Sequence, residues 1–84
     1  MWYVYVLKSE PDGKLNIGST NDLKRRIYQQ NSGIVESTKP RLPLQLQAYI
    51  AVQYEDVARS IEKYLKTGSG HALLHKRILN PAKL

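Results

Sequence analysis

The sequence lacks cysteine altogether, which excludes two classes of small protein. Without thiols, neither a disulfide framework nor a thiolate zinc site can form. Long hydrophobic runs are also missing, since no apolar stretch approaches the roughly 20 residues that a membrane-spanning helix needs. The absence of disulfides suits a reducing compartment, so we expect a cytoplasmic location.

Several familiar catalytic patterns are absent as well. The chain has no glycine-rich phosphate loop, no Ser/His/Asp set and no paired-histidine zinc motif. His71 and His75 stand one helical turn apart, a spacing that suits a metal. A basic, solvated helix face is the alternative interpretation, because no third ligand accompanies them.

Acidic residues are scarce, and the chain is therefore strongly basic. Thirteen Lys and Arg stand against seven Asp and Glu, for a net charge of +6. On a small domain this balance favours polyanionic partners, through phosphate neutralisation and counterion release. Nucleic acid is the partner that we predict, against a generally soluble basic surface as the alternative. No basic amphipathic helix with bulky apolar anchors favours a membrane surface.

A chain of 84 residues fits one small domain. We expect this domain to span residues 1–84, with a core at about 2–79 and a short C-terminal tail at 80–84. Met1 leads straight into a run of aromatic and β-branched residues. That run indicates a strand and not a signal peptide.

Three strands are predicted, and the first two form a hairpin. Residues 2–8 and 14–18 flank Pro11-Asp12-Gly13, which is typical of a turn. Residues 44–52 form the third strand, whose alternation predicts one apolar face made by Leu44, Leu46, Ala48 and Ile50.

Three helices complete the prediction. The first follows capping residues at 19–22 and ends near Gly33, before a loop over residues 34–43 that contains two prolines. The second runs from about 56 to 66 and the last from about 70 to 79. Their predicted buried residues are Val57, Ala58, Ile61, Tyr64 and Leu65 in the second helix, and Leu74 and Ile78 in the last. The order β-β-α-β-α-α predicts an α/β fold with a small three-stranded antiparallel sheet flanked by helices.

Two tripeptides in this pattern carry a family resemblance. Tyr3-Val4-Tyr5 and Asn16-Ile17-Gly18, followed by a helix bearing Arg26, resemble the core motifs of the GIY-YIG nuclease superfamily. Thr38-Lys39-Pro40, Pro43-Leu44 and residues 62–70 also resemble a group of small single-domain bacterial proteins. Those proteins are similar to the N-terminal nuclease domain of the excision-repair endonuclease. The resemblance extends over about residues 2–79.

The resemblance implies a metal-dependent endonuclease that hydrolyses nucleic-acid phosphodiester bonds, in DNA more than in RNA, and that serves DNA repair. Glu62 matches the carboxylate that holds one divalent cation, Mg²⁺ or Mn²⁺. Arg26 matches the arginine that clamps the scissile phosphate. Tyr5 matches an aromatic group that acts as general base or positions water.

Each of these three residues also has a structural interpretation. Glu62 has Arg59 and Lys66 within helical reach and is open to a surface ion pair of little energetic value. Lys24 and Arg25 directly precede Arg26, and the sequence alone does not show which of the three side chains would contact phosphate. A phenol is a poor base near neutral pH, and the alternative for Tyr5 is a sheet residue that packs its ring against a helix.

Two positions depart from the family pattern. Asn16 stands where relatives usually carry tyrosine, and Gln30 stands where they often carry histidine or tyrosine. An amide donates and accepts hydrogen bonds but moves no proton at neutral pH. Both positions belong to the predicted site, so the alternative function is a catalytically weakened or inactive nucleic-acid-binding module.

Phosphate-backbone contacts are predicted from basic residues outside the motifs. These residues are Lys8, Lys24, Arg25, Lys39 and Arg41. We also expect a protein partner that directs a nuclease of this size to its target. A third hypothesis is a protein-interaction domain in which the basic charge is incidental.

Overall fold

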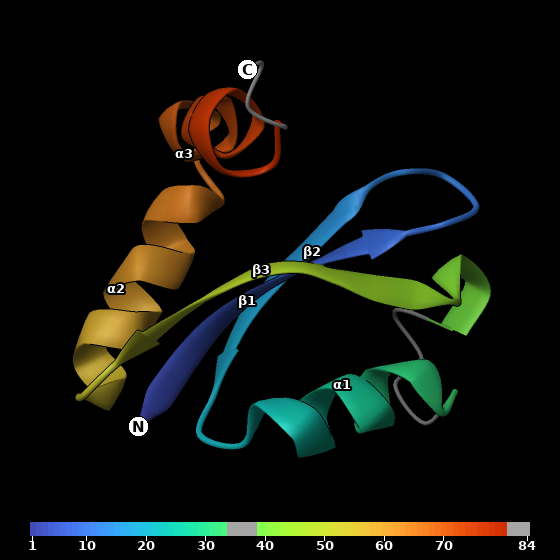
Figure 1. Cartoon of the computed structure of the whole chain (residues 1–84), viewed down its shortest axis with the longest axis horizontal. Helices are drawn as coiled ribbons and strands as arrows, with labels where there is room; N and C mark the ends of the chain where they lie inside the picture. Colours follow the sequence, from blue (N-terminus) through green and yellow to red (C-terminus); the bar gives the residue numbers. More distant parts are fainter. Residues whose placement is uncertain (34–38, 81–84) are drawn as a thin grey trace.

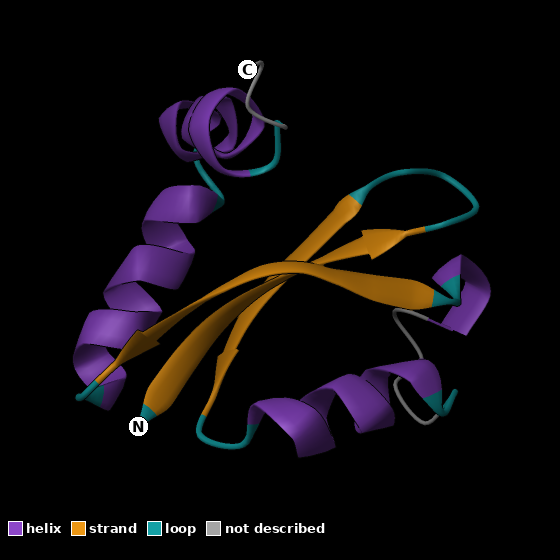
Figure 2. Cartoon of the chain, viewed as in Figure 1, coloured by secondary structure: helices purple, strands orange, loops and turns teal. Residues whose placement is uncertain are grey.

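The computed structural model describes residues 1–33 and 39–80 (Figures 1 and 2). Part of the predicted loop, including Thr38, therefore lies outside the described residues. The elements in chain order are β1 (Trp2–Ser9), β2 (Leu15–Thr20), α1 (Leu23–Asn31), a 3₁₀ turn η1 (Lys39–Arg41), β3 (Leu44–Val52), α2 (Glu55–Leu65), α3 (Gly68–Leu73) and a π-helical turn η2 (Leu74–Ile78). The helices of these ranges include none with the length and apolarity that a bilayer crossing requires.

The three strands form one antiparallel sheet in the order β2-β1-β3. This architecture confirms the predicted fold class. β1 is the central strand, and its residues Val4 to Leu7 are each at most 2% exposed. A central strand covered on both faces reads as a continuous apolar run, which explains the composition of the N-terminal segment.

Helices cover the two faces of the sheet unequally (Figure 1). On one face, α2 and α3 enclose a core made by Val4, Val6, Ile17, Ala58, Leu65 and Leu74. On the other face, α1 contributes Leu23 and Ile27 to a smaller cluster around Tyr5, Leu7 and Leu44. Tyr5 is thus a core residue of the α1 face as well as a candidate for chemistry.

The predicted alternation of β3 is wrong at one point. Val6 pairs with Ala48 but Leu7 pairs with Leu46, so the ladder skips Gln47 in a β-bulge. Residues directly opposite each other share a face of the sheet. Ala48 and Ile50 therefore lie on the α2 face, whereas Leu44 and Leu46 lie on the α1 face. One extra residue reverses the side-chain pattern of everything beyond it.

Helical boundaries follow the predicted signals closely, but the buried faces are narrower than predicted. The side chain of Asp22 accepts a hydrogen bond from the Arg25 backbone N–H at 3.1 Å and caps α1. In α2, Ala58 and Leu65 are buried, whereas Val57 and Tyr64 are 41% and 48% exposed. Ile78 is likewise 40% exposed. A three-stranded sheet covers only the central stripe of a helix, so residues flanking that stripe reach solvent.

The last helix starts earlier than predicted, and a glycine explains how it meets α2. Thr67 caps α3, accepting from the Gly70 backbone N–H at 3.1 Å. A Cβ at Gly70 would lie 2.8 Å from the carbonyl carbon of Tyr64 and would collide with its oxygen. The absence of a side chain therefore lets α3 pack directly against the end of α2.

Gly18 allows a second close approach, within the sheet. It pairs with Tyr5 across β1 and β2. A Cβ at Gly18 would lie 3.1 Å from Cε1 of Tyr5 and closer still to the phenol hydroxyl. The ring of Tyr5 therefore occupies the space that any side chain at this position would need.

We expect Gly18→Ala to lower the free energy of unfolding by about 1–3 kcal/mol, because the buried Tyr5 ring must shift to admit a methyl group. Gly68→Ala is the matched control, since a Cβ at that glycine meets no atom within 4 Å. It should leave stability unchanged or raise it by up to about 1 kcal/mol. Urea denaturation measures both. Equal midpoints for the two variants would contradict the contact described here.

Candidate functional site

A polar pocket of about 670 Å³ opens along the edge strand β2, between α1 and α2. It gathers residues from both faces of the sheet. Its lining includes Trp2, Tyr5, Asn16, Gly18, Ser19, Arg25, Arg26, Gln29, Gln30, Arg59, Glu62 and Lys66. All five residues predicted to form the catalytic site therefore border one pocket, together with several that were not predicted.

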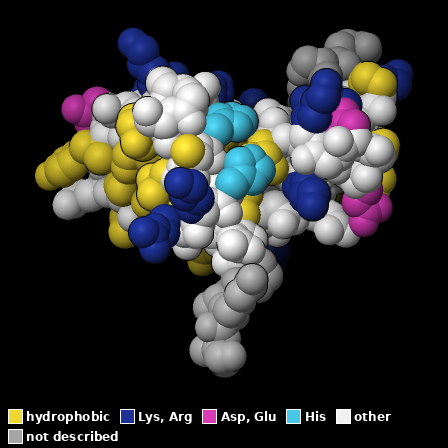
Figure 3. All heavy atoms as spheres, turned by 90° about the horizontal axis from the view of Figure 1, so that it is seen from above, with side chains coloured by type: hydrophobic (Ala, Val, Ile, Leu, Met, Phe, Trp, Pro, Cys, Tyr) yellow, Lys and Arg dark blue, Asp and Glu magenta, His cyan; other side chains and the backbone are white. Residues whose placement is uncertain are grey.

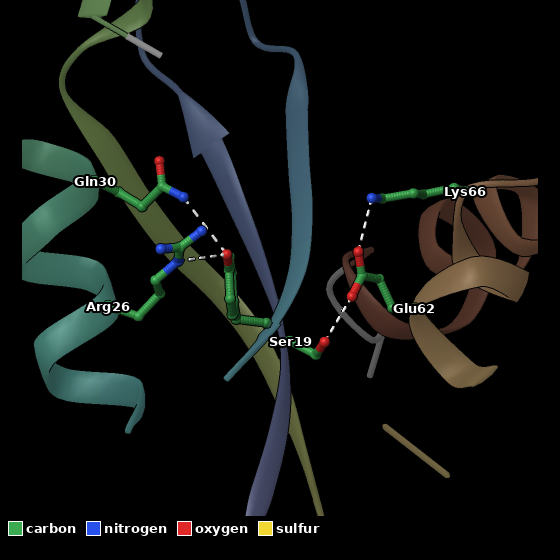
Figure 4. Close-up of polar contacts among 6 residues, drawn as sticks. Ser19, Arg26, Gln30, Glu62 and Lys66 are labelled. Atoms are coloured by element: carbon green, nitrogen blue, oxygen red, sulfur yellow. Dashed lines mark hydrogen bonds and ion pairs between the residues drawn. The ribbon is translucent and has the colours of Figure 1, made fainter. Parts of the chain in front are cut away.

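On the α1 side, the pocket is organised around the phenol of Tyr5, the unlabelled side chain at which the dashed lines from Arg26 and Gln30 meet in Figure 4. Arg26 donates a hydrogen bond from Nε to the Tyr5 hydroxyl at 3.2 Å, and Gln30 donates from Nε2 at 3.5 Å. Arg26 and Gln30 are four residues apart and share a face of α1. The phenol oxygen accepts from both donors, so its O–H is the group with which it can contact a ligand.

On the α2 side, the pocket is organised around the carboxylate of Glu62 (Figure 4). Ser19 donates from Oγ to Oε1 at 2.6 Å, and Lys66 donates from Nζ to Oε2 at 2.7 Å. The predicted alternative of an ion pair with Lys66 is thus present. Arg59 instead pairs with Glu55 at 2.7 Å. Glu62 both forms that ion pair and lines the pocket.

The environment of Glu62 favours its ionised form. Partial burial by itself would raise the pKa of this carboxyl, but hydrogen bonds from Lys66 and Ser19 and the charge of Lys66 outweigh it, so the pKa lies below its ordinary value. Glu62 is therefore a carboxylate at neutral pH. Because the pKa of Glu62 is lower in the folded state than in the unfolded chain, its ionisation stabilises the fold at pH values above the unfolded-state pKa. This stabilisation is lost as the pH falls through the folded-state pKa.

Two consecutive residues of β2 join the halves of the pocket. Gly18 pairs with Tyr5 and lies on the α1 face, whereas Ser19 pairs with Val4 and lies on the α2 face. Asn16 pairs with Leu7 and borders the pocket on the same face as Tyr5. The edge strand β2 therefore runs between the side chains of Arg26 and Glu62 (Figure 4).

The predicted phosphate contacts are scattered over the surface. Arg25 borders the pocket, and Lys24 lines a neighbouring depression on the other side of α1. Lys8 lies in a third depression beside His75, and Lys39 is exposed on η1. Arg41 is turned toward Asp12, with Nε at 3.5 Å from a carboxylate oxygen. The structure thus brings only Arg25 of these five residues to the pocket.

Sequence reasoning missed Ser19 as a partner of Glu62 and treated Lys66 only as a surface partner. Ser19 lies 43 residues before Glu62, and its hydrogen bond depends on the packing of α2 on the sheet. A usable signal was the strand alternation, which places a residue directly after Gly18 on the opposite face. Lys66 follows Glu62 by one helical turn, and the i,i+4 spacing already indicated the contact.

The histidine pair has no third metal-ligating partner in the part of the chain that the structure describes. Within residues 1–33 and 39–80, no group of three His, Asp or Glu side chains is placed to hold a metal ion. The rings of His71 and His75 lie 6.1 Å apart and are tilted by 50°. Figure 3 shows both rings at the surface near Lys and Arg side chains, which fits the predicted basic face.

We expect Ser19→Ala to raise the pKa of Glu62, because burial then acts against one fewer hydrogen bond. Ser60→Ala is the control, since Ser60 is exposed on the same helix as Glu62. Carboxyl-detected NMR titration follows the Glu62 signal in both variants. An identical titration in wild type and Ser19→Ala would show that the serine does not support the carboxylate.

One comparison with known proteins identifies the chain. A family model described as the GIY-YIG catalytic domain matches residues 1–74, a span that includes every predicted catalytic position. No curated protein and no solved structure matches the chain significantly. The matched span covers β1 through α3 and reaches the first residue of η2, so it takes in both sides of the pocket. The chain therefore belongs to the GIY-YIG catalytic domain family, a family of nucleases.

Proposed function

We propose that the pocket binds a phosphodiester of a nucleic acid, DNA in preference to RNA, and hydrolyses it as an endonuclease assisted by a divalent cation. The observation that supports this most is the single pocket shared by Arg26, Tyr5 and the ionised Glu62. Phosphodiester hydrolysis needs charge stabilisation on the phosphate oxygens, a positioned water and help for the leaving oxygen. Resemblance to the excision-repair nuclease domain makes DNA repair the process that we propose for it.

The residues of the pocket fit a hard cation. Mg²⁺ and Mn²⁺ take oxygen ligands, and Mg²⁺ is commonly held by one or two carboxylates, with waters and substrate phosphate completing its shell. Glu62 supplies a carboxylate, and the hydroxyl of Ser19 lies beside it. When bound, the cation supplies Lewis-acid stabilisation of the phosphate and lowers the pKa of a bound water.

Arg26 is the group that we assign to the scissile phosphate. Its Nε is already directed to Tyr5, which holds the guanidinium plane in place. The two Nη groups are then the donors for a pair of parallel hydrogen bonds to phosphate oxygens. A lysine at position 26 would supply a positive charge but could not donate two parallel hydrogen bonds in a fixed plane.

Tyr5 is the group that we assign to the attacking water. Two N–H donors meet its oxygen, and its ring is fixed by the contact with Gly18. Because its oxygen already accepts from Arg26 and Gln30, this rigid phenol contacts the water or the phosphate by donating its own O–H, with little further ordering needed. Arg25, Lys24 and Lys39 are the exposed cations that we assign to the flanking backbone, whereas Arg41 is turned toward Asp12.

We expect Glu62→Gln and Arg26→Lys each to lower Mn²⁺-dependent nicking of DNA by about 100-fold or more, because each removes charge or geometry used in the transition state. Glu55→Gln and Arg77→Lys are matched controls on exposed positions outside the pocket. A plasmid-nicking assay with and without EDTA measures all four. Wild-type rates in both pocket variants would contradict the proposal.

A second function is favoured by two residues of the same pocket. Asn16 borders it where tyrosine is usual in relatives, and Gln30 is engaged with Tyr5 where histidine or tyrosine is frequent. Neither amide transfers a proton at neutral pH. The second candidate is therefore a nucleic-acid-binding module with weak catalysis or none.

Asn16→Tyr separates the two candidates. We expect the variant to cut DNA faster than wild type, by up to about 100-fold, because a phenol restores a group able to assist proton transfer. Binding of a fluorescent oligonucleotide, measured by anisotropy, should stay the same. An inactive wild type with an active variant would establish the binding module. Failure of both to bind DNA or RNA at any salt concentration would favour a protein-interaction domain.

A further inference from the structure

The carboxylate of Glu62 already has a positive charge beside it, the ammonium of Lys66. The ammonium of Lys66 lies 2.7 Å from Oε2, and the hydroxyl of Ser19 lies 2.6 Å from Oε1. Both carboxylate oxygens are therefore engaged before any metal arrives. In Figure 4, Lys66 and Ser19 reach Glu62 from opposite ends of the carboxylate.

The two partners of Glu62 differ in what they can share with a cation. A serine hydroxyl carries lone pairs and is able to turn, so it fits beside a metal ion as a neighbour or a ligand. An ammonium carries three donors, no acceptor and a positive charge. It cannot stay in contact with the same oxygen as a divalent cation without repulsion between like charges.

Lys66 is also the more exposed member of this ion pair. The lysine side chain is 54% exposed and the glutamate side chain is 21% exposed. Lys66 lines the same pocket as Arg26, and ion pairs of exposed i,i+4 partners contribute little to stability. Breaking the ion pair with Glu62 therefore costs little free energy. The displaced ammonium stays in the pocket, where a phosphate would bind.

We propose that Lys66 competes with the divalent cation for Glu62 and, once displaced, turns its ammonium to the substrate phosphate. The inference rests on the proposed function, because it assigns the cation to Glu62 and the phosphate to the pocket. It makes Lys66 a substrate-binding residue that couples the two ligands. Phosphate that draws Lys66 away from Glu62 raises the affinity for the cation, and by linkage the cation raises the affinity for phosphate.

The first test measures binding of Mn²⁺ alone, from the free-ion electron paramagnetic resonance signal. Lys66→Met should bind Mn²⁺ about two- to five-fold more tightly than Lys63→Met. Lys63 is exposed on the same helix and is not among the pocket residues, so both variants lose one positive charge. Lys66→Arg retains a cation next to Glu62 and should keep the wild-type affinity. Equal affinities for Lys66→Met and Lys63→Met would overturn the proposal.

The second test measures coupling, with a short phosphorothioate DNA strand as the probe. The strand should raise the affinity for Mn²⁺ in wild type and in Lys63→Met, and less in Lys66→Met. The same increase in all three proteins would overturn the coupling. Neither test measures cleavage, so tighter Mn²⁺ binding by Lys66→Met upholds this inference even where the wild-type protein cuts no DNA and the nuclease proposal is rejected. Circular dichroism of each variant verifies that it is folded.

Discussion

The phenol of Tyr5 lies where a side chain at Gly18 would otherwise stand, and the pocket is arranged around that contact. The buried ring fixes the hydroxyl, and the hydroxyl in turn holds Arg26 and Gln30 on the α1 side. The next residue of the same strand, Ser19, turns to the other face and meets Glu62. A single residue without a side chain thus lets two groups of polar side chains share one strand edge.

The electrostatics of the pocket suit a polyanion that arrives with a cation. Among the residues that line it, four are basic and two are acidic: Arg25, Arg26, Arg59, Lys66, Asp22 and Glu62. Asp22 is used as the cap of α1, which leaves Glu62 as the carboxylate available for chemistry. Its low pKa keeps it charged at neutral pH. The basic surroundings favour a phosphate, and Glu62 is the carboxylate to which we assign the cation.

The differences between the predicted and observed structures have local causes. In β3, the bulge at Gln47 places Leu46 on one face and Ala48 on the other, which no alternating pattern reveals. In α2, the hydrophobic residues Val57 and Tyr64 belong to the predicted stripe but reach solvent, because the sheet beneath is narrow. Arg41 was predicted on a phosphate-binding surface, yet it is turned toward Asp12.

The sequence by itself determined the elements, their order, the family and the chemical types present at the candidate site. Caps, turns and strand composition act over a few residues, so they are readable along the chain. Only the tertiary structure decided that Ser19 supports Glu62, that Lys66 holds the same carboxylate, and that most of the basic residues lie away from the pocket. These contacts depend on the packing of α2 against the sheet and on side-chain orientations, which sequence spacing alone does not fix.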